Sequence, residues 1–176
     1  VTAEFSSEVF KAKKYLERRG IGKTSDLWYW KFGIVEENED LSHRIIFPSF
    51  DCAGKLNYWT ARAFSKEAKG MKYQNPQVDR KSIIFNEFNI DWNSPLTLVE
   101  GPFDLVKCNQ NATCLLGSEF TSEYKLFRTI VENKTPVVLA LDPDAKMKAL
   151  KIAKELSEYD IKVTLLTVPP EKEDVG

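Results

Sequence analysis

Apolar residues in the second half of the chain fall into short runs, and segments with helical periodicity separate these runs. The runs predict strands at 95–100, 111–117, 135–142 and 161–168. The segments between them predict helices at 102–110, 121–133 and 144–159. Strands that alternate with helices indicate a mainly parallel sheet that is covered by helices.

The first half of the chain has a mixed pattern. Residues 6–20 have the periodicity of an amphipathic helix, and residues 24–33 predict a second, shorter helix. Residues 43–64 predict two strands that are joined by a turn at 51–54. This half therefore lacks the regular strand–helix alternation of the second half.

The change of pattern predicts two subdomains, with residues 88–95 as the connection between the halves. We expect a mixed α+β subdomain at 1–94 and a parallel sheet flanked by helices at 95–176, which together make an α/β fold. A chain of 176 residues with 43% hydrophobic content is large enough for such a core.

Composition disfavours several classes of site. The three cysteines are odd in number and form no Cys-x-x-Cys pair, so we expect reduced thiols and no zinc. The single histidine, His43, gives little support to a His-based metal cluster or to Ser-His-Asp catalysis. There is no apolar run of membrane-spanning length and no signal-peptide centre, which favours a cytoplasmic protein without a membrane partner.

Charge is unevenly distributed along the chain. Residues 55–81 carry seven Lys or Arg against two acids, whereas acids exceed bases by 13 to 10 from Leu96 onward. The basic segment can be a nucleic-acid surface or a solvated face, and charge alone leaves both readings open.

Four carboxylates follow the predicted strands of the second half. Glu100 and Asp142 end strands, Asp104 lies in the first turn of the helix that begins near Pro102, and Asp144 precedes the next helix. Sites in open parallel sheets form at the carboxyl ends of strands, and neighbouring strands lie about 4.8 Å apart. If the two strands are neighbours, the carboxylates converge and need a cation.

A cation held only by oxygens is expected to be Mg²⁺ or Mn²⁺, which stabilises charge during phosphoryl transfer. Each residue also has a plain structural reading: Asp144 as a helix N-cap and Asp104 as a partner of the helix dipole.

The motif Glu-Gly-x-x-Asp, followed about forty residues later by Asp-x-Asp after a strand, resembles the Toprim domain of bacterial-type primases, topoisomerases and some nucleases. The resemblance makes Glu100 and Asp104 the first acidic motif of a magnesium site, and Asp142 and Asp144 the second. One departure is Met147, where primases usually carry glycine.

A third acidic motif is expected after the last strand, where this chain has "PPEKEDVG". Asp174 matches the first aspartate of that motif, and the sequence ends before the second. We therefore expect the Toprim subdomain at 95–176 to be truncated at its C-terminal end.

The first half resembles the catalytic core of bacterial-type primases. The matching stretches are "KKYLERRGIGKTSDLWYWKFGI", "HRIIFPSFDCAGKLNYWTARAF" and "MKYQNP", in the order that the family has them. Together with the acidic motifs they cover nearly the whole chain. The compact length favours a phage version, which implies a location in the host cytoplasm.

The resemblance places five residues in the groove that holds template, primer and nucleotide: Arg44, Arg62, Lys72, Tyr73 and Asn75. Arginine and lysine donate to phosphates, and tyrosine can stack on a base. Plain readings stay open: Arg62 paired with a surface acid, Tyr73 in the core, and Arg44 as a solvated strand-edge residue. We expect the four tryptophans to serve packing: Trp28, Trp30, Trp59 and Trp92.

The implied function is template-directed synthesis of short RNA primers on single-stranded DNA from nucleoside triphosphates. Glu100, Asp142 and Asp144 are the expected catalytic residues, and all five acids are expected metal ligands. A replicative helicase is an expected partner through parts that this sequence lacks. The alternatives are a Toprim-type nuclease and a non-catalytic nucleic-acid-binding module. A topoisomerase is disfavoured because the chain is too short for the domains that carry the cleavage tyrosine of those enzymes.

Overall fold

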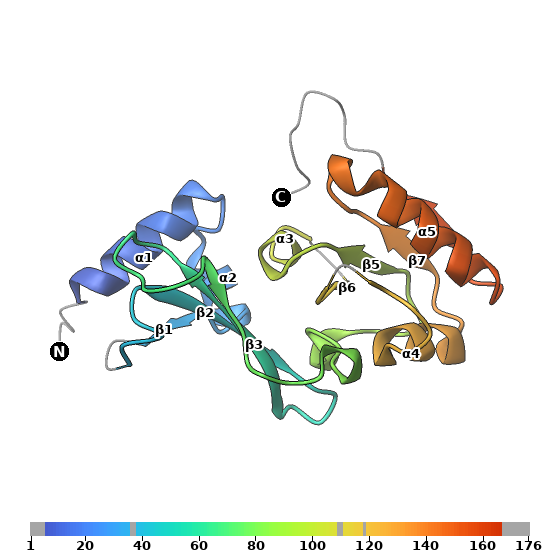
Figure 1. Ribbon diagram of the computed structural model, residues 1–176, viewed down its shortest axis with the longest axis horizontal. Helices are drawn as coiled ribbons and strands as arrows, with labels where there is room; N and C mark the ends of the chain where they lie inside the picture. The colour runs from blue at the N-terminus through green and yellow to red at the C-terminus, as the bar shows by residue number, and fades with distance from the viewer. Residues whose placement is uncertain (1–5, 36–37, 109–110, 118, 167–176) are drawn as a thin grey trace. The chain divides into compact units, whose positions relative to one another are not determined.

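A computed structural model describes residues 6–35, 38–108, 111–117 and 119–166 (Figure 1). The chain divides into two compact units. The first unit consists of Val1–Pro48 and Tyr58–Gln77, and the second of Ser49–Asn57 and Val78–Gly176. The tip of the hairpin near residues 49–57 thus belongs to the second unit. The functional boundary between residues 94 and 95 stays a prediction.

The first unit contains two helices and an antiparallel arrangement of strands. Its helices are α1 (Ser7–Arg18) and α2 (Thr24–Tyr29). Its sheet has the order β1-β2-β3-β4, with β1 (Gly33–Ile34), β2 (Arg44–Phe50), β3 (Leu56–Ala63) and β4 (Tyr73–Gln74). Ser6 caps α1 by accepting a hydrogen bond from the Val9 amide. The predicted helix–helix–hairpin pattern is confirmed.

Aromatic rings pack around Phe47 of β2, which is fully buried. The rings of Trp30 and Phe32 lie 5.5 and 4.5 Å from it, measured between centroids. Trp28 differs from the sequence expectation, because its side chain is 79% exposed and does not belong to the core. The pattern of the sequence could not separate neighbouring aromatic residues on so short a helix.

The second unit contains a parallel sheet of the order β6-β5-β7-β8. Its strands are β5 (Leu96–Val99), β6 (Ala112–Cys114), β7 (Val137–Leu139) and β8 (Val163–Leu165). Its α-helices are α3 (Pro102–Leu105), α4 (Lys125–Asn133) and α5 (Lys146–Ser157). Its described residues also include short 3₁₀ turns at Arg80–Ser82, Glu87–Asn89 and Pro143–Ala145. The predicted α/β class is confirmed.

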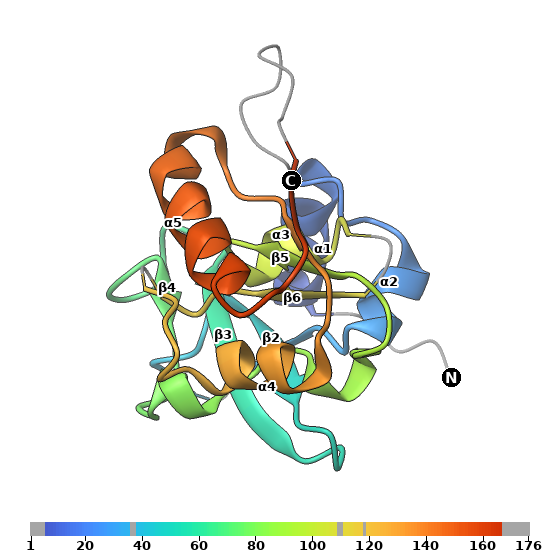
Figure 2. The same cartoon turned by 90° about the vertical axis from the view of Figure 1, so that its right-hand side faces the viewer.

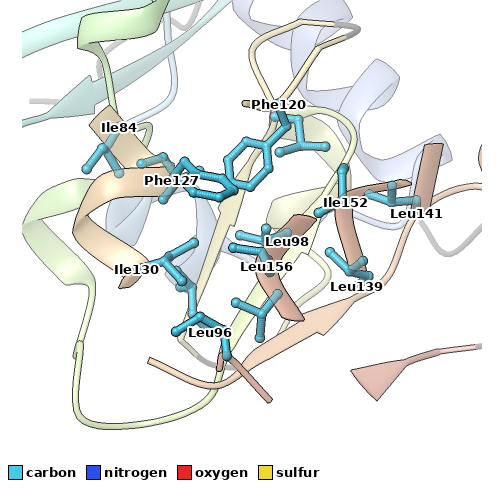
Figure 3. Close-up of a cluster of buried hydrophobic side chains, with 14 residues drawn as sticks. Ile84, Leu96, Leu98, Phe120, Phe127, Ile130, Leu139, Leu141, Ile152 and Leu156 are labelled. Carbon is cyan, nitrogen blue, oxygen red and sulfur yellow. The ribbon is translucent and has the colours of Figure 1, made fainter. Parts of the chain in front are cut away.

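The core of the second unit lies between the sheet and the helices α4 and α5, whose ribbons appear in Figure 2, and Figure 3 shows the buried side chains. Leu96 and Leu98 alternate along β5 and are fully buried, so they face the same side of the sheet. Side chains of α4 and α5 pack on that side, among them Phe127 and Leu156. Leu98 lies beside Leu139 in the parallel register, so β5 and β7 share one core layer.

Two helix starts differ from the sequence expectation. The helix expected from residue 121 begins at Lys125, with Tyr124 at the N-cap position. The helix expected to be capped by Asp144 begins at Lys146, and Ala145 takes the N-cap position. The physical reason is that Pro143 starts a 3₁₀ turn, which carries Asp144 before the α-helix begins. Asp144 is therefore not the cap of α5.

None of the helices in the described ranges combines the length and the hydrophobicity that crossing a bilayer requires.

Candidate metal centre and nucleic-acid-binding residues

The two expected acidic strand ends meet at one edge of the parallel sheet. Glu100 directly follows β5, and Asp142 lies three residues beyond the end of β7. The two strands are neighbours, with Leu98 opposite Leu139, and the Ala140 amide donates to the Leu98 carbonyl at 2.9 Å. Both carboxylates therefore leave the sheet at its carboxyl edge, which is where sites form in such folds.

Three carboxylates form a compact group at this edge. One oxygen from each of Glu100, Asp142 and Asp144 lies within 4.8 Å of the others. Glu100 and Asp142 are half-buried, and Asp144 is exposed on the 3₁₀ turn that Pro143 begins. A group of oxygen donors that is open to solvent on one side can hold a metal ion, and its chemistry suits a hard cation. We call these three residues the acidic triad.

A lysine that the sequence reasoning missed also belongs to this site. The Nζ of Lys148, on α5, lies 3.2 Å from Glu100 Oε1 and 3.1 Å from the Gly117 carbonyl oxygen. Lys148 follows Asp144 by four residues, and this spacing could have indicated a shared face. Its ammonium group offsets part of the repulsion within the acidic triad.

Asp104 is held by its own helix. Its Oδ2 accepts a hydrogen bond from the Gly101 amide at 3.0 Å, at the start of α3. This supports the plain reading of a helix-terminus carboxylate, and Asp104 lies outside the acidic triad. Its role as a metal ligand stays a prediction. Asp174 lies outside the described residues, so its role stays a prediction as well.

Two cysteines near this site are protected from ionisation. Burial raises the pKa of Cys108, and the negative charge of Asp104 raises it further. The fully buried Cys114 has its pKa raised well above the ordinary value for the same two reasons. Neither thiol is therefore suited to act as a nucleophile at neutral pH.

Met147, which replaces the family glycine, is 77% exposed and does not enter the core.

Arg44 is placed inside the first unit. Its side chain is fully buried, and its guanidinium donates to the backbone carbonyls of Asp40, Lys69 and Lys72. Burial lowers the pKa of Arg44. The reading as a solvated strand-edge residue is therefore wrong. The predicted contact with nucleic acid is untested, and the structure gives Arg44 a supporting position under residues 69–72.

Arg62 lies between two tyrosines. It is 6% exposed, and its guanidinium donates to the hydroxyl groups of Tyr15 and Tyr73. The guanidinium carbon lies 4.9 Å from the centroid of the Tyr73 ring, a cation–π distance. These contacts hold Arg62 between two tyrosine side chains, and its pairing with a surface acid stays an untested reading.

The other predicted groove residues are accessible. Lys72 and Tyr73 are exposed, and Asn75 is half-buried. Tyr73 lies on β4, the outermost strand beside β3, so the reading of Tyr73 as a core residue is wrong. The five predicted groove residues therefore divide into accessible or half-buried side chains, which can reach a ligand, and the buried Arg44 and Arg62, which hold Lys72 and Tyr73.

No protein-family model and no curated protein matches the chain. Solved structures do match it. The DnaG primase catalytic domain bound to single-stranded DNA has 16% sequence identity and a TM-score of 0.74, covering 96% of this chain and 67% of that one. This chain has the fold of a DnaG primase catalytic core. The RNA polymerase domain of Mycobacterium tuberculosis DnaG gives 16% identity and a TM-score of 0.74, with 97% and 72% of the two chains covered.

The primase catalytic core of E. coli is similar to the same extent, with 16% identity, a TM-score of 0.72, and 96% and 68% of the two chains covered. The likeness to DnaG extends over both units of the chain, which confirms the fold that the sequence motifs implied. At this identity it concerns the fold. The roles of individual residues rest on the geometry described above.

Proposed function

We propose that this chain is a primase catalytic core that synthesises short RNA primers on single-stranded DNA from nucleoside triphosphates. The observation that carries the proposal is the acidic triad at the carboxyl edge of a parallel sheet, in a chain with the DnaG core fold. The products of the reaction are an RNA chain and pyrophosphate. The same proposal makes the protein a nucleotidyltransferase that acts in DNA replication.

The acidic triad is proposed to hold Mg²⁺ or Mn²⁺, because its three donors are all carboxylate oxygens. When bound, such an ion supplies charge stabilisation for the triphosphate and for the attacking 3′ oxygen. The half-buried positions of Glu100 and Asp142 fix two ligands, and the exposed Asp144 keeps the site open to a nucleotide. Asp104 and Asp174 remain proposed additional ligands.

Lys72, Tyr73 and Asn75 are proposed to contact the template, primer or nucleotide. A lysine ammonium donates to phosphates, and an exposed tyrosine ring can stack on a base. Arg44 and Arg62 then act mainly through the residues that they hold, since Arg44 donates to the Lys72 carbonyl and Arg62 to the Tyr73 hydroxyl.

The experiment that tests the proposal is incubation of the chain with single-stranded DNA, labelled nucleotides and Mg²⁺ or Mn²⁺. Labelled RNA of primer length supports primase activity. Shortened DNA would instead identify a nuclease, and DNA that is shifted on a gel but chemically unchanged would identify a binding module. A parallel reaction with a chelator is the control for dependence on a metal ion.

Lys148→Met is expected to tighten Mn²⁺ binding. The ammonium group lies 3.2 Å from Glu100 Oε1 and opposes a second cation there. Loss of an interaction worth about 1 kcal/mol or less corresponds to an affinity gain of up to about five-fold. Calorimetric titration with Mn²⁺ measures this, with the exposed Lys151→Met on the same helix as the matched control. Equal affinities in both variants would place Lys148 outside the metal centre.

Lys72→Ala is expected to weaken binding of single-stranded DNA and to make it less sensitive to salt. Each lost phosphate contact lowers the slope of log affinity against log salt by about 0.7. Fluorescence anisotropy with a labelled oligonucleotide at several salt concentrations measures the slope. Lys151→Ala serves as the matched lysine control. An unchanged slope in Lys72→Ala would assign this lysine to a solvated face.

A further inference from the structure

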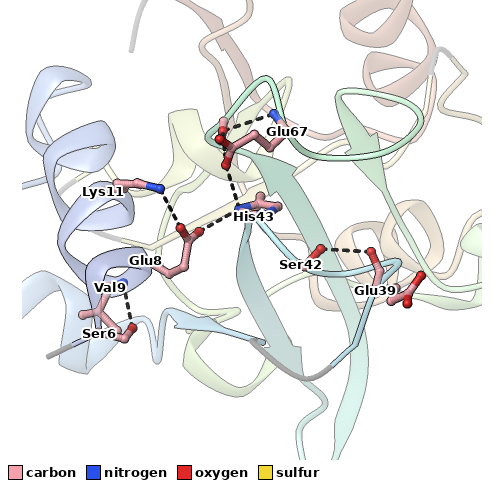
Figure 4. A network of polar contacts seen from close by, with 9 residues as sticks. Ser6, Glu8, Val9, Lys11, Glu39, Ser42, His43 and Glu67 are labelled. Carbon is pink, nitrogen blue, oxygen red and sulfur yellow. Dashed lines mark hydrogen bonds and ion pairs between the residues drawn. The ribbon is translucent and has the colours of Figure 1, made fainter.

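A second group of metal-ligating side chains lies in the first unit, in a different part of the chain from the acidic triad. One ligand atom from each of Glu8, His43 and Glu67 lies within 4.8 Å of the others (Figure 4). Glu8 comes from α1, His43 from the segment before β2, and Glu67 from the loop after β3. The His43 Nδ1 lies 2.7 Å from Glu8 Oε2 and 3.5 Å from Glu67 Oε2.

Neighbouring groups fix the orientation of both carboxylates. Lys11 donates to the other oxygen of Glu8, Oε1, at 2.8 Å, so Oε2 is the oxygen that faces His43. Ser65 Oγ lies 3.4 Å from Glu67 Oε2 and accepts a hydrogen bond from the Glu67 amide. Outer partners that orient the ligands in this way are a general feature of protein metal sites. When the His43 imidazole is neutral, the positive charge of Lys11 and the negative charges of Glu8 and Glu67 sum to a net charge of −1 for the group.

The spacing and the surroundings suit a small transition-metal ion. Tetrahedral zinc with bonds of about 2.0–2.2 Å places its ligand atoms roughly 3.3–3.6 Å apart, which the 3.5 Å between His43 Nδ1 and Glu67 Oε2 matches. The 2.7 Å between His43 Nδ1 and Glu8 Oε2 is a hydrogen-bond distance, which has to lengthen when a metal ion takes the place of the shared proton. A cavity of about 120 Å³ adjoins the group, with Glu8, Ser42 and His43 in its lining. That volume accommodates an ion and a water molecule.

We propose that Glu8, His43 and Glu67 form a binding site for a borderline divalent transition metal such as Zn²⁺, with water as the fourth ligand. One nitrogen and two carboxylate oxygens make up the kind of three-residue set that leaves a coordination position open. Binding uses the lone pair of His43 Nδ1, so a proton on that nitrogen is released when the metal binds. The competing arrangement is an imidazolium that is paired with both carboxylates and binds no metal.

The proposed site has a structural consequence for the first unit. It joins the start of α1 to the two segments that precede β2 and β4. Glu67 is two residues from Lys69, whose carbonyl accepts a hydrogen bond from Arg44. Zn²⁺ would therefore brace the segment that presents Lys72. The sequence expectation of no zinc considered clusters of cysteine and histidine, and it could not foresee that two distant glutamates converge on His43.

The test is a titration of the full chain with Zn²⁺ after treatment with a chelator and its removal. Cys52→Ser is used as the background because Cys52 is an exposed free cysteine, and thiolates are zinc ligands. Because the acidic triad also offers ligands to Zn²⁺, the titration is repeated with Asp142→Asn/Asp144→Asn added to this background, which separates the proposed site from the acidic triad and from the proposed primase activity. In that variant we expect one calorimetric binding event per chain and a melting temperature that rises with Zn²⁺ concentration.

His43→Asn and Glu67→Gln are each expected to abolish the binding event. Asparagine is chosen because His43 has a φ of 58°, a left-handed conformation that asparagine tolerates. Glu67 is exposed, so Glu67→Gln keeps the test valid if His43→Asn fails to fold. The matched control is Glu39→Gln, an exposed acid of the same unit. No binding in the Cys52→Ser background, or equal binding in Glu67→Gln, would overturn the proposal.

Discussion

Asp142→Asn combined with Asp144→Asn is expected to abolish nucleotide incorporation while the fold is preserved. The two carboxylates supply two of the three oxygen donors of the acidic triad. Asparagine keeps the size of each side chain but removes the charge that a divalent cation needs. A metal ion contributes several kcal/mol to stabilisation of the transition state, so we expect a loss of at least about 100-fold in the rate.

The melting temperature of this variant shows whether activity is lost because metal ligands are missing or because the protein unfolds. Removal of two like charges that lie within 4.8 Å of Glu100 is expected to leave the melting temperature unchanged or to raise it when no metal is present. The matched control is Glu132→Gln with Glu158→Gln, which removes two exposed acids of the same unit and should retain full activity. Primer synthesis at wild-type rate in Asp142→Asn/Asp144→Asn would exclude the acidic triad as the metal centre.

Arg44→Met is expected to give the largest loss of stability among the variants considered. The guanidinium donates to three backbone carbonyls from a fully buried position. Methionine fills part of the space but leaves these acceptors without their donor. Since hydrogen bonds from a charged group are the stronger ones, we expect a loss of about 2–4 kcal/mol in the free energy of unfolding.

Arg44→Met is also expected to weaken binding of single-stranded DNA, although Arg44 itself is buried. Its donors hold the carbonyls of Lys69 and Lys72, and loosening this segment disorders the Lys72 side chain that is proposed to contact phosphate. Urea unfolding and anisotropy titration at low salt measure the two effects. Arg18→Met, at an exposed position of α1, should change stability by less than about 0.5 kcal/mol. An equally small change in Arg44→Met would contradict the supporting role.

The parallel sheet and the acidic triad could be predicted because their signals are local. Short apolar runs that alternate with helical segments leave few other arrangements, and a carboxylate after a buried strand marks the edge where such strands end. The neighbouring positions of β5 and β7 then brought Glu100 and Asp142 together as expected. The sequence did not locate the start of α5. Pro143 begins a 3₁₀ turn, and the helical periodicity of the residues that follow hides the boundary between this turn and the α-helix.

The surroundings of the arginines could not be predicted because their partners are distant in sequence. Arg62 meets Tyr15, which lies 47 residues away, and Arg44 meets the Lys69 carbonyl, which lies 25 residues away. An isolated arginine in a strand pattern is compatible with a phosphate contact, a surface ion pair or a buried clamp. Only the tertiary arrangement of the first unit distinguishes these uses, and the same holds for the convergence of Glu8 and Glu67 on His43.

Dependence on the template sequence is the most direct test of the proposed primase function. The chain is incubated with Mn²⁺, all four nucleoside triphosphates with only UTP labelled, and one of two single-stranded DNA templates that differ in containing or lacking adenine. Template-directed synthesis predicts labelled RNA on the template with adenine and unlabelled RNA of similar length on the other. Equal incorporation of UTP on both templates, or no RNA on either, would contradict the account.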